Sequence, residues 1–130
     1  MTKQQRNNEP LAGLKALIIE DDAMIAALLH DTLIEAGAAQ VLVHDAVAAG
    51  IAELSEADLD ILILDTQVGD RNDGWAVAEL VEHLSVKRCA IIFATGLPEA
   101  VPPHVAALGT VVGKPYTAEQ IIAAITAQLK

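Results

Sequence analysis

The sequence predicts an α/β fold in which strands and helices alternate along a single domain. Five apolar runs have the near-continuous character of parallel strands that are buried on both faces, at residues 15–20, 40–44, 60–65, 89–95 and 109–113. Segments with the 3.6-residue period of helices separate them. Because consecutive βα units take right-handed crossovers, the helices should cover both faces of the sheet in a three-layer α/β sandwich.

The first and last helices carry end signals as well as apolar stripes. Asp22 is the candidate N-cap of the first helix, and Gly37 supplies its stop. The run from Thr117 to Gln120 has the capping-box pattern that opens the last helix. The predicted apolar stripe of the first helix consists of Ile25, Leu28, Leu29 and Leu33.

The three helices between them differ in the strength of their signals. Residues 45–54 and 77–84 carry the apolar spacing of the second and third helices. The fourth is the weakest, because Pro98, Pro102 and Pro103 crowd its start and leave about two turns.

Length and composition bound the domain organisation. The 130 residues fit one domain, with a polar, flexible tail over residues 1–13 and the folded domain over residues 14–130. One cysteine, Cys89, excludes an internal disulfide framework and a cysteine-based zinc site. No signal-peptide core and no stretch of transmembrane length is present, so we expect a cytoplasmic protein with no membrane partner.

The charge argues against one class of partner. The formal net charge is −10, and the chain has one Phe, one Tyr and one Trp. An acidic surface repels phosphate backbones, and the aromatic platforms of a single-strand binder are missing. We therefore expect no nucleic-acid binding, and partners that are proteins, metal cations or small phosphodonors.

Polar side chains follow four of the predicted strands at the point where each strand ends. Glu20 and Asp21 follow the first strand, Asp65 ends the third, Thr95 ends the fourth and Lys114 follows the fifth. The carboxyl ends of parallel strands share one edge of a sheet, and ligands bind outside that edge. These groups should therefore meet in one site.

The carboxylates of this group predict a magnesium site. Like charges at short range disfavour joint ionisation, and a hard divalent cation relieves this repulsion. Asp21 and Asp65 are the expected direct ligands, Glu20 acts directly or through water, and the backbone carbonyl of Gln67 adds a further oxygen.

The remaining groups suit phosphoryl transfer to a carboxylate. Asp65 is the candidate nucleophile, because a carboxylate can attack phosphorus and form an aspartyl phosphate. The transition state spreads negative charge over the equatorial oxygens. The Lys114 ammonium, the Thr95 hydroxyl and the backbone amide of Gly96 would stabilise that charge together with the metal.

The same residues resemble a response regulator receiver domain. The acidic group after residues 17–19, the acceptor Asp65, Thr95 and the pair Lys114-Pro115 carry the resemblance, which covers about residues 14–129. It implies a flavodoxin-like (βα)5 fold with a five-stranded parallel sheet in the order 2-1-3-4-5. It also implies Mg²⁺ as cofactor, a phosphate contact from the backbone of Thr66, and a cis bond before Pro115.

A narrower resemblance lies in residues 93–97, Phe-Ala-Thr-Gly-Leu. This run is similar to the FAT GUY receivers, stand-alone regulators associated with HWE-type histidine kinases and the general stress response; Pro98 stands where their motif closes with Tyr. Typical receivers carry Tyr or Phe three residues before the lysine, and this chain has Val111. Rotation of an aromatic ring at that position is therefore not its relay.

These observations predict a single-domain response regulator of a two-component phosphorelay, a monomer or weak dimer. It would take a phosphoryl group from a histidine kinase on Asp65, assist its own phosphorylation and dephosphorylation without being an enzyme, and signal to a downstream protein by contact. One alternative is a pseudo-receiver that binds partners without phosphorylation. Another is a phosphotransferase of the haloacid-dehalogenase type, which would need a second Asp where the chain has Gln67, and a cap domain.

Overall fold

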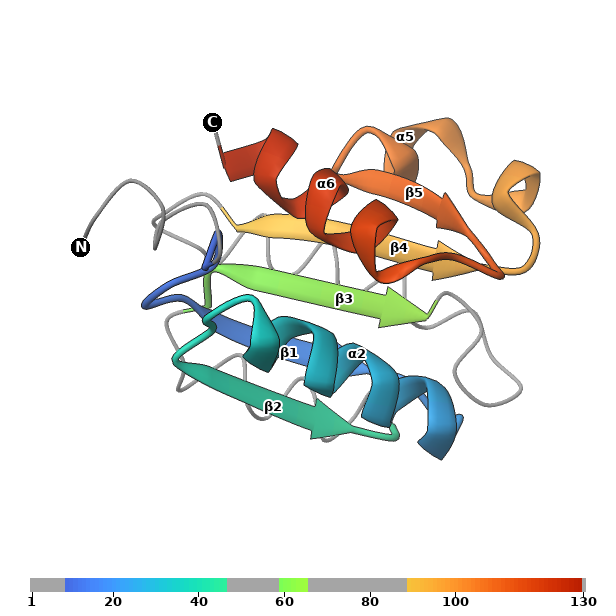
Figure 1. The fold of residues 1–130 in the computed structure, drawn as a ribbon. Helices are drawn as coiled ribbons and strands as arrows, with labels where there is room; N and C mark the ends of the chain where they lie inside the picture. The colour runs from blue at the N-terminus through green and yellow to red at the C-terminus, as the bar shows by residue number, and fades with distance from the viewer. Residues whose placement is uncertain (1–8, 47–58, 66–88, 130) are drawn as a thin grey trace.

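The five predicted strands form one parallel sheet. A computed structural model describes residues 9–46, 59–65 and 89–129. The strands are β1 (Lys15–Ile19), β2 (Gln40–His44), β3 (Ile61–Asp65), β4 (Ala90–Thr95) and β5 (Thr110–Gly113). They lie in the order β2-β1-β3-β4-β5, and their arrows all point the same way in Figure 1. The predicted fold class and strand order are confirmed.

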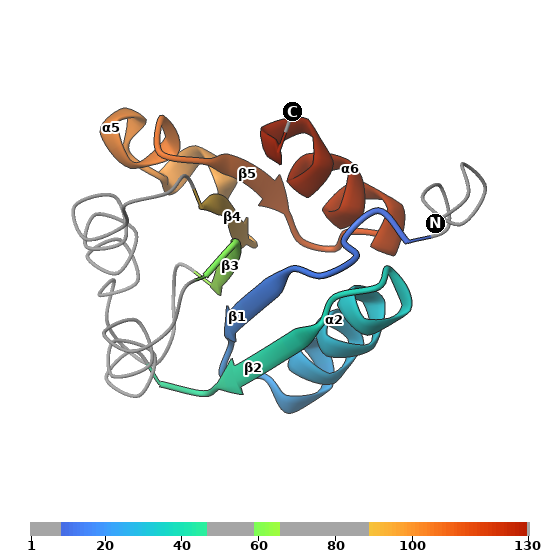
Figure 2. The same cartoon turned by 90° about the vertical axis from the view of Figure 1, so that its left-hand side faces the viewer.

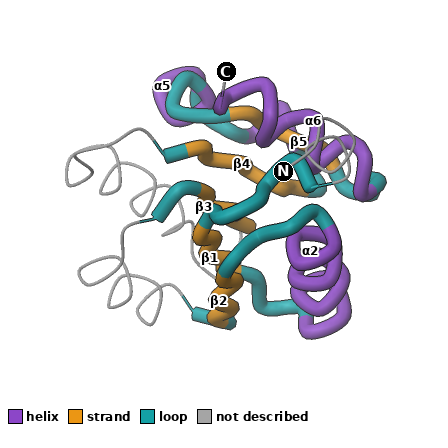
Figure 3. The backbone as a smooth tube through the Cα atoms, turned by 60° about the vertical axis from the view of Figure 1, so that its left-hand side comes forward, coloured by secondary structure: helices purple, strands orange, loops and turns teal. Residues whose placement is uncertain are grey.

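Helices pack on both faces of this sheet. Helices α2 (Ala23–Glu35) and α6 (Ala118–Leu129) lie together on one face, and α5 (Pro103–Ala106) lies on the other (Figures 2 and 3). Each face has its own buried apolar cluster: Leu17, Leu62 and Phe93 point to the α5 side, whereas Ile18, Ile63 and Ile92 point to the α2 and α6 side. Adjacent residues of one strand thus belong to opposite clusters, because successive side chains of a strand point to opposite faces of the sheet.

Helix α2 begins and ends at the predicted signals, but its buried face is narrower than expected. The Asp22 side chain accepts hydrogen bonds from the amides of Met24 and Ile25, and Gly37 follows the helix with a φ of +100°. The buried side chains are Ala26, Leu29 and Leu33. The prediction that Leu28 lies on this stripe is wrong: its side chain is 66% exposed, because the inner face of the helix is formed by Ala26, Leu29 and Leu33.

The predicted burial of the strands on both faces is wrong for β2. Residues 40–44 are exposed or half-buried, and Val43 is 40% exposed. The reason is topological, since β2 is the last strand at one side of the sheet and only β1 pairs with it in the described residues. The central strands β1, β3 and β4 fit the expectation.

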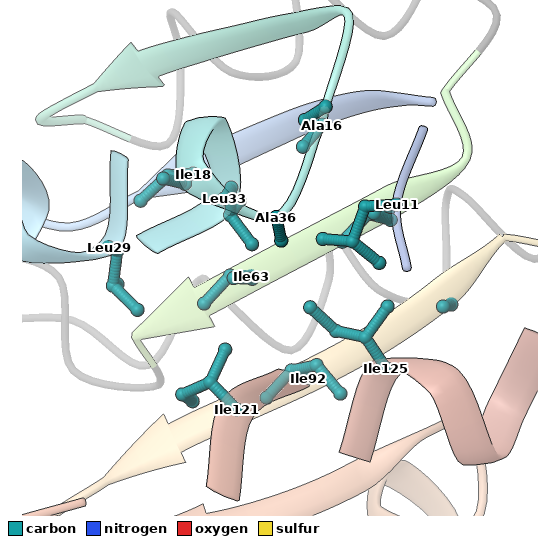
Figure 4. Close-up of a cluster of buried hydrophobic side chains, with 13 residues drawn as sticks. Leu11, Ala16, Ile18, Leu29, Leu33, Ala36, Ile63, Ile92, Ile121 and Ile125 are labelled. Atoms are coloured by element: carbon teal, nitrogen blue, oxygen red, sulfur yellow. The ribbon is translucent and has the colours of Figure 1, made fainter. Parts of the chain in front are cut away.

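The predicted flexible tail is also too long, because residues 9–13 belong to the folded domain. Leu11 is fully buried, and Figure 4 shows its side chain among residues from α2, the sheet and α6. Its amide donates to the carbonyl of Ala36 over 2.9 Å. One leucine in a polar segment has no periodicity that would predict its burial, so the sequence pattern predicts a tail that ends at residue 13. Residues 1–8 lie outside the described part.

Helix α6 is fixed at both ends. At its start, Thr117 and Gln120 exchange the two hydrogen bonds of a capping box, as predicted. At its end, the side-chain amide of Gln128 accepts from the amide of Ile91 and donates to the carbonyl of Ile91 and the hydroxyl of Thr110. The loop before β5 crosses at the same point, since a Cβ on Gly109 would collide with the Ile91 carbonyl.

The weak fourth helix is shorter than predicted, because the proline-rich segment leaves one helical turn instead of about two. A 3-10 turn at Pro98–Ala100 precedes the single turn of α5. The predicted second and third helices, at residues 45–54 and 77–84, fall almost wholly or wholly outside the described residues. None of the helices in the described part has both the length and the apolar character that crossing a membrane requires.

Replacing Gly109 by alanine should destabilise the fold. The added Cβ would meet the carbonyl of Ile91, so either β4 or the loop must move, which costs about 2–3 kcal/mol on the scale of overpacked cores. Urea unfolding of Gly109→Ala against wild type measures this. Gly96→Ala is the matched control, because nothing lies within 4 Å of its added Cβ. Equal losses in both variants would contradict this account.

Candidate functional site

The register of the sheet brings the predicted site residues to one edge. Ile19 pairs with Leu64, so Glu20 follows β1 beside Asp65, the last residue of β3. Asp65 pairs with Ala94 and Thr95 pairs with Gly113, which places Lys114 next to this group. The amide of Lys114 donates to the Thr95 carbonyl over 2.7 Å, extending the ladder by one bond. All four strand ends face the same edge (Figure 1).

The Lys114 ammonium joins two buried carboxylates. Its Nζ atom lies 3.0 Å from Glu20 Oε1 and 3.4 Å from Asp65 Oδ2. Glu20 is 2% exposed and Asp65 is 7% exposed. Burial opposes the charge of Lys114, but the hydrogen bond to Glu20 and the charges of both carboxylates outweigh it, so the pKa of Lys114 lies above its usual value. The site therefore holds a permanent cation.

Glu20 is the most perturbed acid of this group. Burial, followed by its hydrogen bond with Asp65, raises the pKa of Glu20 from 4.5 to about 7, although Lys114 and the amide of Asp22 pull it down. That amide donates to Glu20 Oε2 over 3.2 Å. Two buried carboxyl groups thus share one lysine, and the lysine alone does not compensate for the burial of Glu20.

The same carboxyl groups form a candidate cation site. One oxygen from each of Glu20, Asp21 and Asp65 lies within 4.8 Å of the others. Asp21 is exposed, whereas the other two are buried, so the cluster opens to solvent on the Asp21 side. All-oxygen clusters of this kind suit Mg²⁺, which keeps several waters and uses one or two carboxylates. These residues fit the predicted metal site.

The other predicted residues surround this cluster or lie outside the described part. Thr95 is 2% exposed, and its hydroxyl oxygen accepts from the amide of Leu97 over 3.0 Å. Gly96 is exposed, with open space beside its backbone. The Lys114–Pro115 peptide bond is cis, as the resemblance implied. The backbone groups of Thr66 and Gln67 fall outside the described residues.

Sequence reasoning missed one residue of this region, Tyr116. Its hydroxyl oxygen is buried and has no hydrogen-bond partner among the described residues. An unsatisfied buried hydroxyl costs about 1–3 kcal/mol. Burial first, then the charges of Glu20 and Asp65, raise the pKa of Tyr116 to about 12. Its place two residues after Lys114 was the only signal, and a lone tyrosine carries no motif.

A family model matches the chain across most of its length. The model of the response regulator receiver domain matches residues 16–126. Among curated proteins no relative matches the chain. The matched segment contains the acidic cluster of Glu20, Asp21 and Asp65, together with Thr95 and Lys114.

Solved structures share the fold at low sequence identity. A CheY-like receiver domain from Methylobacillus flagellatus has a TM-score of 0.75 at 20% identity, over 88% of this chain and 99% of that one. A response regulator from Burkholderia pseudomallei, with a phosphorylated aspartic acid, calcium ion and citrate, gives 0.72 at 19%, over 89% and 70%. A mutant of the anti-anti-sigma factor PhyR from Bartonella quintana gives 0.77 at 21%, over 96% and 52%.

Metal-free stability should fall as the pH rises through the range in which folded Glu20 ionises. The unfolded chain releases this proton near pH 4.5 and the folded protein near pH 7, so the folded state binds more protons between these values. Rising pH therefore costs stability there, and the effect levels off above about pH 7. Thermal unfolding of wild type and Glu20→Gln in EDTA checks this. The difference in midpoint between the variants should grow by a few degrees from pH 5 to pH 8; a constant difference would contradict the raised pKa.

Proposed function

The chain belongs to the response regulator receiver domain family, and we propose that it is a single-domain response regulator that accepts a phosphoryl group on Asp65. The donor is a histidine kinase, and the reaction depends on Mg²⁺. The N–P bond of the donor phosphohistidine breaks as a bond from phosphorus to an Asp65 oxygen forms. The signal then passes to a downstream protein by contact.

The position of Asp65 supports this proposal more than any other observation. Its carboxylate is buried, the Lys114 ammonium lies 3.4 Å from it, and one oxygen each of Glu20 and Asp21 lies within 4.8 Å of one of its oxygens. A nucleophile that lies beside a lysine and belongs to a cation-binding cluster is in an environment that stabilises negative charge on an incoming phosphoryl group. A carboxylate that served only as a helix cap would not need this arrangement.

Each residue of the site has a distinct task in this proposal. Glu20, Asp21 and Asp65 would hold Mg²⁺, with the Gln67 carbonyl as a further ligand. The bound ion would neutralise the charge of the carboxylates and of one phosphoryl oxygen. Lys114 turns from Glu20 to a second phosphoryl oxygen. The Thr95 hydroxyl and the amides of Gly96 and Thr66 bind the remaining charge. The protein turns over no separate substrate, but these groups assist both phosphorylation of Asp65 and its hydrolysis.

The exposed surface of α2 next to the site is the proposed docking surface of the phosphodonor. Met24 and Leu28 are 78% and 66% exposed and lie four residues apart on one side of α2. Large exposed apolar side chains that group beside a reactive centre are typical of protein contacts. We place the phosphodonor here, and the downstream protein on the surface of α5, β5 and α6.

The proposed setting is a cytoplasmic phosphorelay of the general stress response with an HWE-type kinase. Two observations support it: the Phe-Ala-Thr-Gly run at residues 93–96, and the shared fold with a protein named as an anti-anti-sigma factor. Within that setting the chain would act as a relay, a phosphate sink or a controller of an anti-sigma system, as a monomer or weak dimer.

The alternative of a pseudo-receiver predicts different chemistry at the same residues. It would bind partners without modification of Asp65, and it would gain nothing from a metal. A haloacid-dehalogenase-like phosphotransferase would release phosphate from a separate substrate. The five groups that lie at one edge of the sheet favour the phosphoacceptor; they are Glu20, Asp21, Asp65, Thr95 and Lys114.

Beryllofluoride, a mimic of the phosphoryl group, should bind to wild type in the presence of Mg²⁺ and not to Asp65→Asn. Amide spectra of the labelled protein should shift for residues around Asp65, Thr95 and Lys114, with no shift when Mg²⁺ is left out. Asp31→Asn is the matched control, because Asp31 is exposed and contributes no ligand to the cluster. Wild type that fails to respond would leave the pseudo-receiver as the better reading.

Magnesium alone should raise the unfolding midpoint by a few degrees at pH 8, because the cation relieves repulsion between the buried carboxylates and binds only the folded state. Asp21→Asn should need at least tenfold more Mg²⁺ for the same rise, because it loses one of the three carboxylates. Glu119→Gln removes an acid of α6 outside the cluster and should behave as wild type. Scanning calorimetry across a Mg²⁺ series measures all three; a wild-type midpoint that stays constant at saturation of the site would refute the repulsion argument.

A further inference from the structure

The loop that follows β4 is anchored at both ends. At its start, the carbonyl of Thr95 accepts from the amide of Lys114 over 2.7 Å, and the Thr95 hydroxyl oxygen accepts from the amide of Leu97 over 3.0 Å. At its end, Pro98 opens the 3-10 turn that contacts β5. Only Gly96 and Leu97 lie between the two anchors. The loop that carries the Gly96 amide therefore has little freedom to move.

The anchor at Pro98 depends on a glycine in β5. A Cβ added to Gly113 would lie 3.1 Å from Cγ of Pro98, which is closer than ordinary van der Waals contact. Gly113 has no positive φ, so its backbone conformation does not require glycine. What the glycine provides here is space for the proline ring. Gly113 is also the partner of Thr95 in the β4–β5 ladder, so both ends of the loop rest against the end of β5.

The anchored loop carries two of the donors that the proposed reaction uses. The Thr95 hydroxyl is buried, and because it accepts from the amide of Leu97 it keeps its own proton to donate. Gly96 is exposed, and nothing lies within 4 Å of the position that a Cβ would take there. Donors stabilise a developing oxyanion best when they are fixed before the reaction. A small displacement of the loop would move both donors at once.

We propose that Pro98 and Gly113 are positioning residues of the phosphoacceptor site. Their contact fixes the loop that presents the Thr95 hydroxyl and the Gly96 amide to a phosphoryl oxygen. The inference rests on the proposed function of Asp65, and neither positioning residue binds the phosphoryl group itself. Pro98 is exposed, so a displacement of its ring opens no cavity in the core. The contact therefore governs the position of the donors more than the stability of the fold.

The variant Gly113→Ala tests the contact, because its Cβ requires the ring of Pro98 to give by a few tenths of an ångström. A hydrogen bond to a charged group that is lost altogether costs at least about tenfold in affinity, so misplaced donors should weaken beryllofluoride binding at saturating Mg²⁺ by about fourfold. The affinity for Mg²⁺ itself should equal that of wild type, because the acidic cluster is untouched. NMR titrations of the full chain measure both affinities. Equal beryllofluoride affinity in variant and wild type would overturn the inference and leave the proposed function standing.

The variant Pro98→Ala shows whether the effect passes through the proline ring. It removes the atom that the new Cβ would meet, and it releases the loop, so alone it should weaken beryllofluoride binding by a similar factor. Adding Gly113→Ala to it should cost nothing further, because the two residues act as one unit. Losses that multiply in the double variant, or wild-type affinity in Pro98→Ala, would overturn the inference. Pro10→Ala is the matched control for the loss of a proline and should bind as wild type, because Pro10 precedes β1 at the opposite edge of the sheet.

Hydrogen exchange reports on the loop in the absence of metal and beryllofluoride. The amide of Leu97 is bonded to the Thr95 hydroxyl, so it should exchange faster in Gly113→Ala and in Pro98→Ala than in wild type. The unfolding midpoint of Gly113→Ala should stay equal to wild type or rise, since alanine in a strand costs less backbone entropy than glycine. Unchanged exchange at Leu97 in both variants would overturn the inference, as would a fall of the midpoint together with a loss of Mg²⁺ affinity. If wild type itself binds no beryllofluoride, the proposed function fails and this inference fails with it.

Discussion

The contact of the Lys114 ammonium with Glu20 and Asp65 is the interaction on which the rest of the site depends. Two carboxyl groups are buried at the end of a sheet whose interior is otherwise apolar, and burying them without a cation would be strongly unfavourable. The lysine reaches them because β5 ends at Gly113, level with Thr95, and the amide of Lys114 still bonds to the Thr95 carbonyl, which fixes the backbone of residue 114. The proposed role of Asp65 as phosphoacceptor and the stability of the sheet edge therefore depend on one side chain.

Much of this arrangement was predictable because the relevant signals are local and periodic. Each strand is an apolar run in the sequence. A polar residue at the carboxyl end of such a run must lie at one known edge of a parallel sheet. What could not be predicted depends on the pairing of distant atoms. The sequence shows that Glu20 and Lys114 are neighbours at an edge, but not that the lysine lies closer to Glu20 than to Asp65. The exposure of Leu28 and the burial of Leu11 were missed for the same reason, because each depends on which segment packs above it.

This chain has Val111 where typical receivers have an aromatic residue, and the structure places its one tyrosine on the other side of the sheet. Val111 packs partly buried against the cluster on the α5 side, and the chain's one tyrosine lies instead on the α2 side, two residues after Lys114. The site is thus linked to the α2 surface by Lys114, Pro115 and Tyr116, all of which line one cavity. The surface of α2 is therefore a candidate contact surface next to the site, in addition to the helices that follow β4 and β5.

The burial of Leu11 and the hydrogen bonds of Gln128 have a practical consequence for protein engineering. Both residues lie outside the segment that matches the family model, residues 16–126, yet one fills the core between α2 and α6 and the other secures α6 to the start of β4. A receiver cut at the family boundaries and grafted onto another output domain would lose both anchors. The segment that should be transferred is therefore longer than residues 16–126, which match the family model. Fusions should be made before Leu11 and after Gln128.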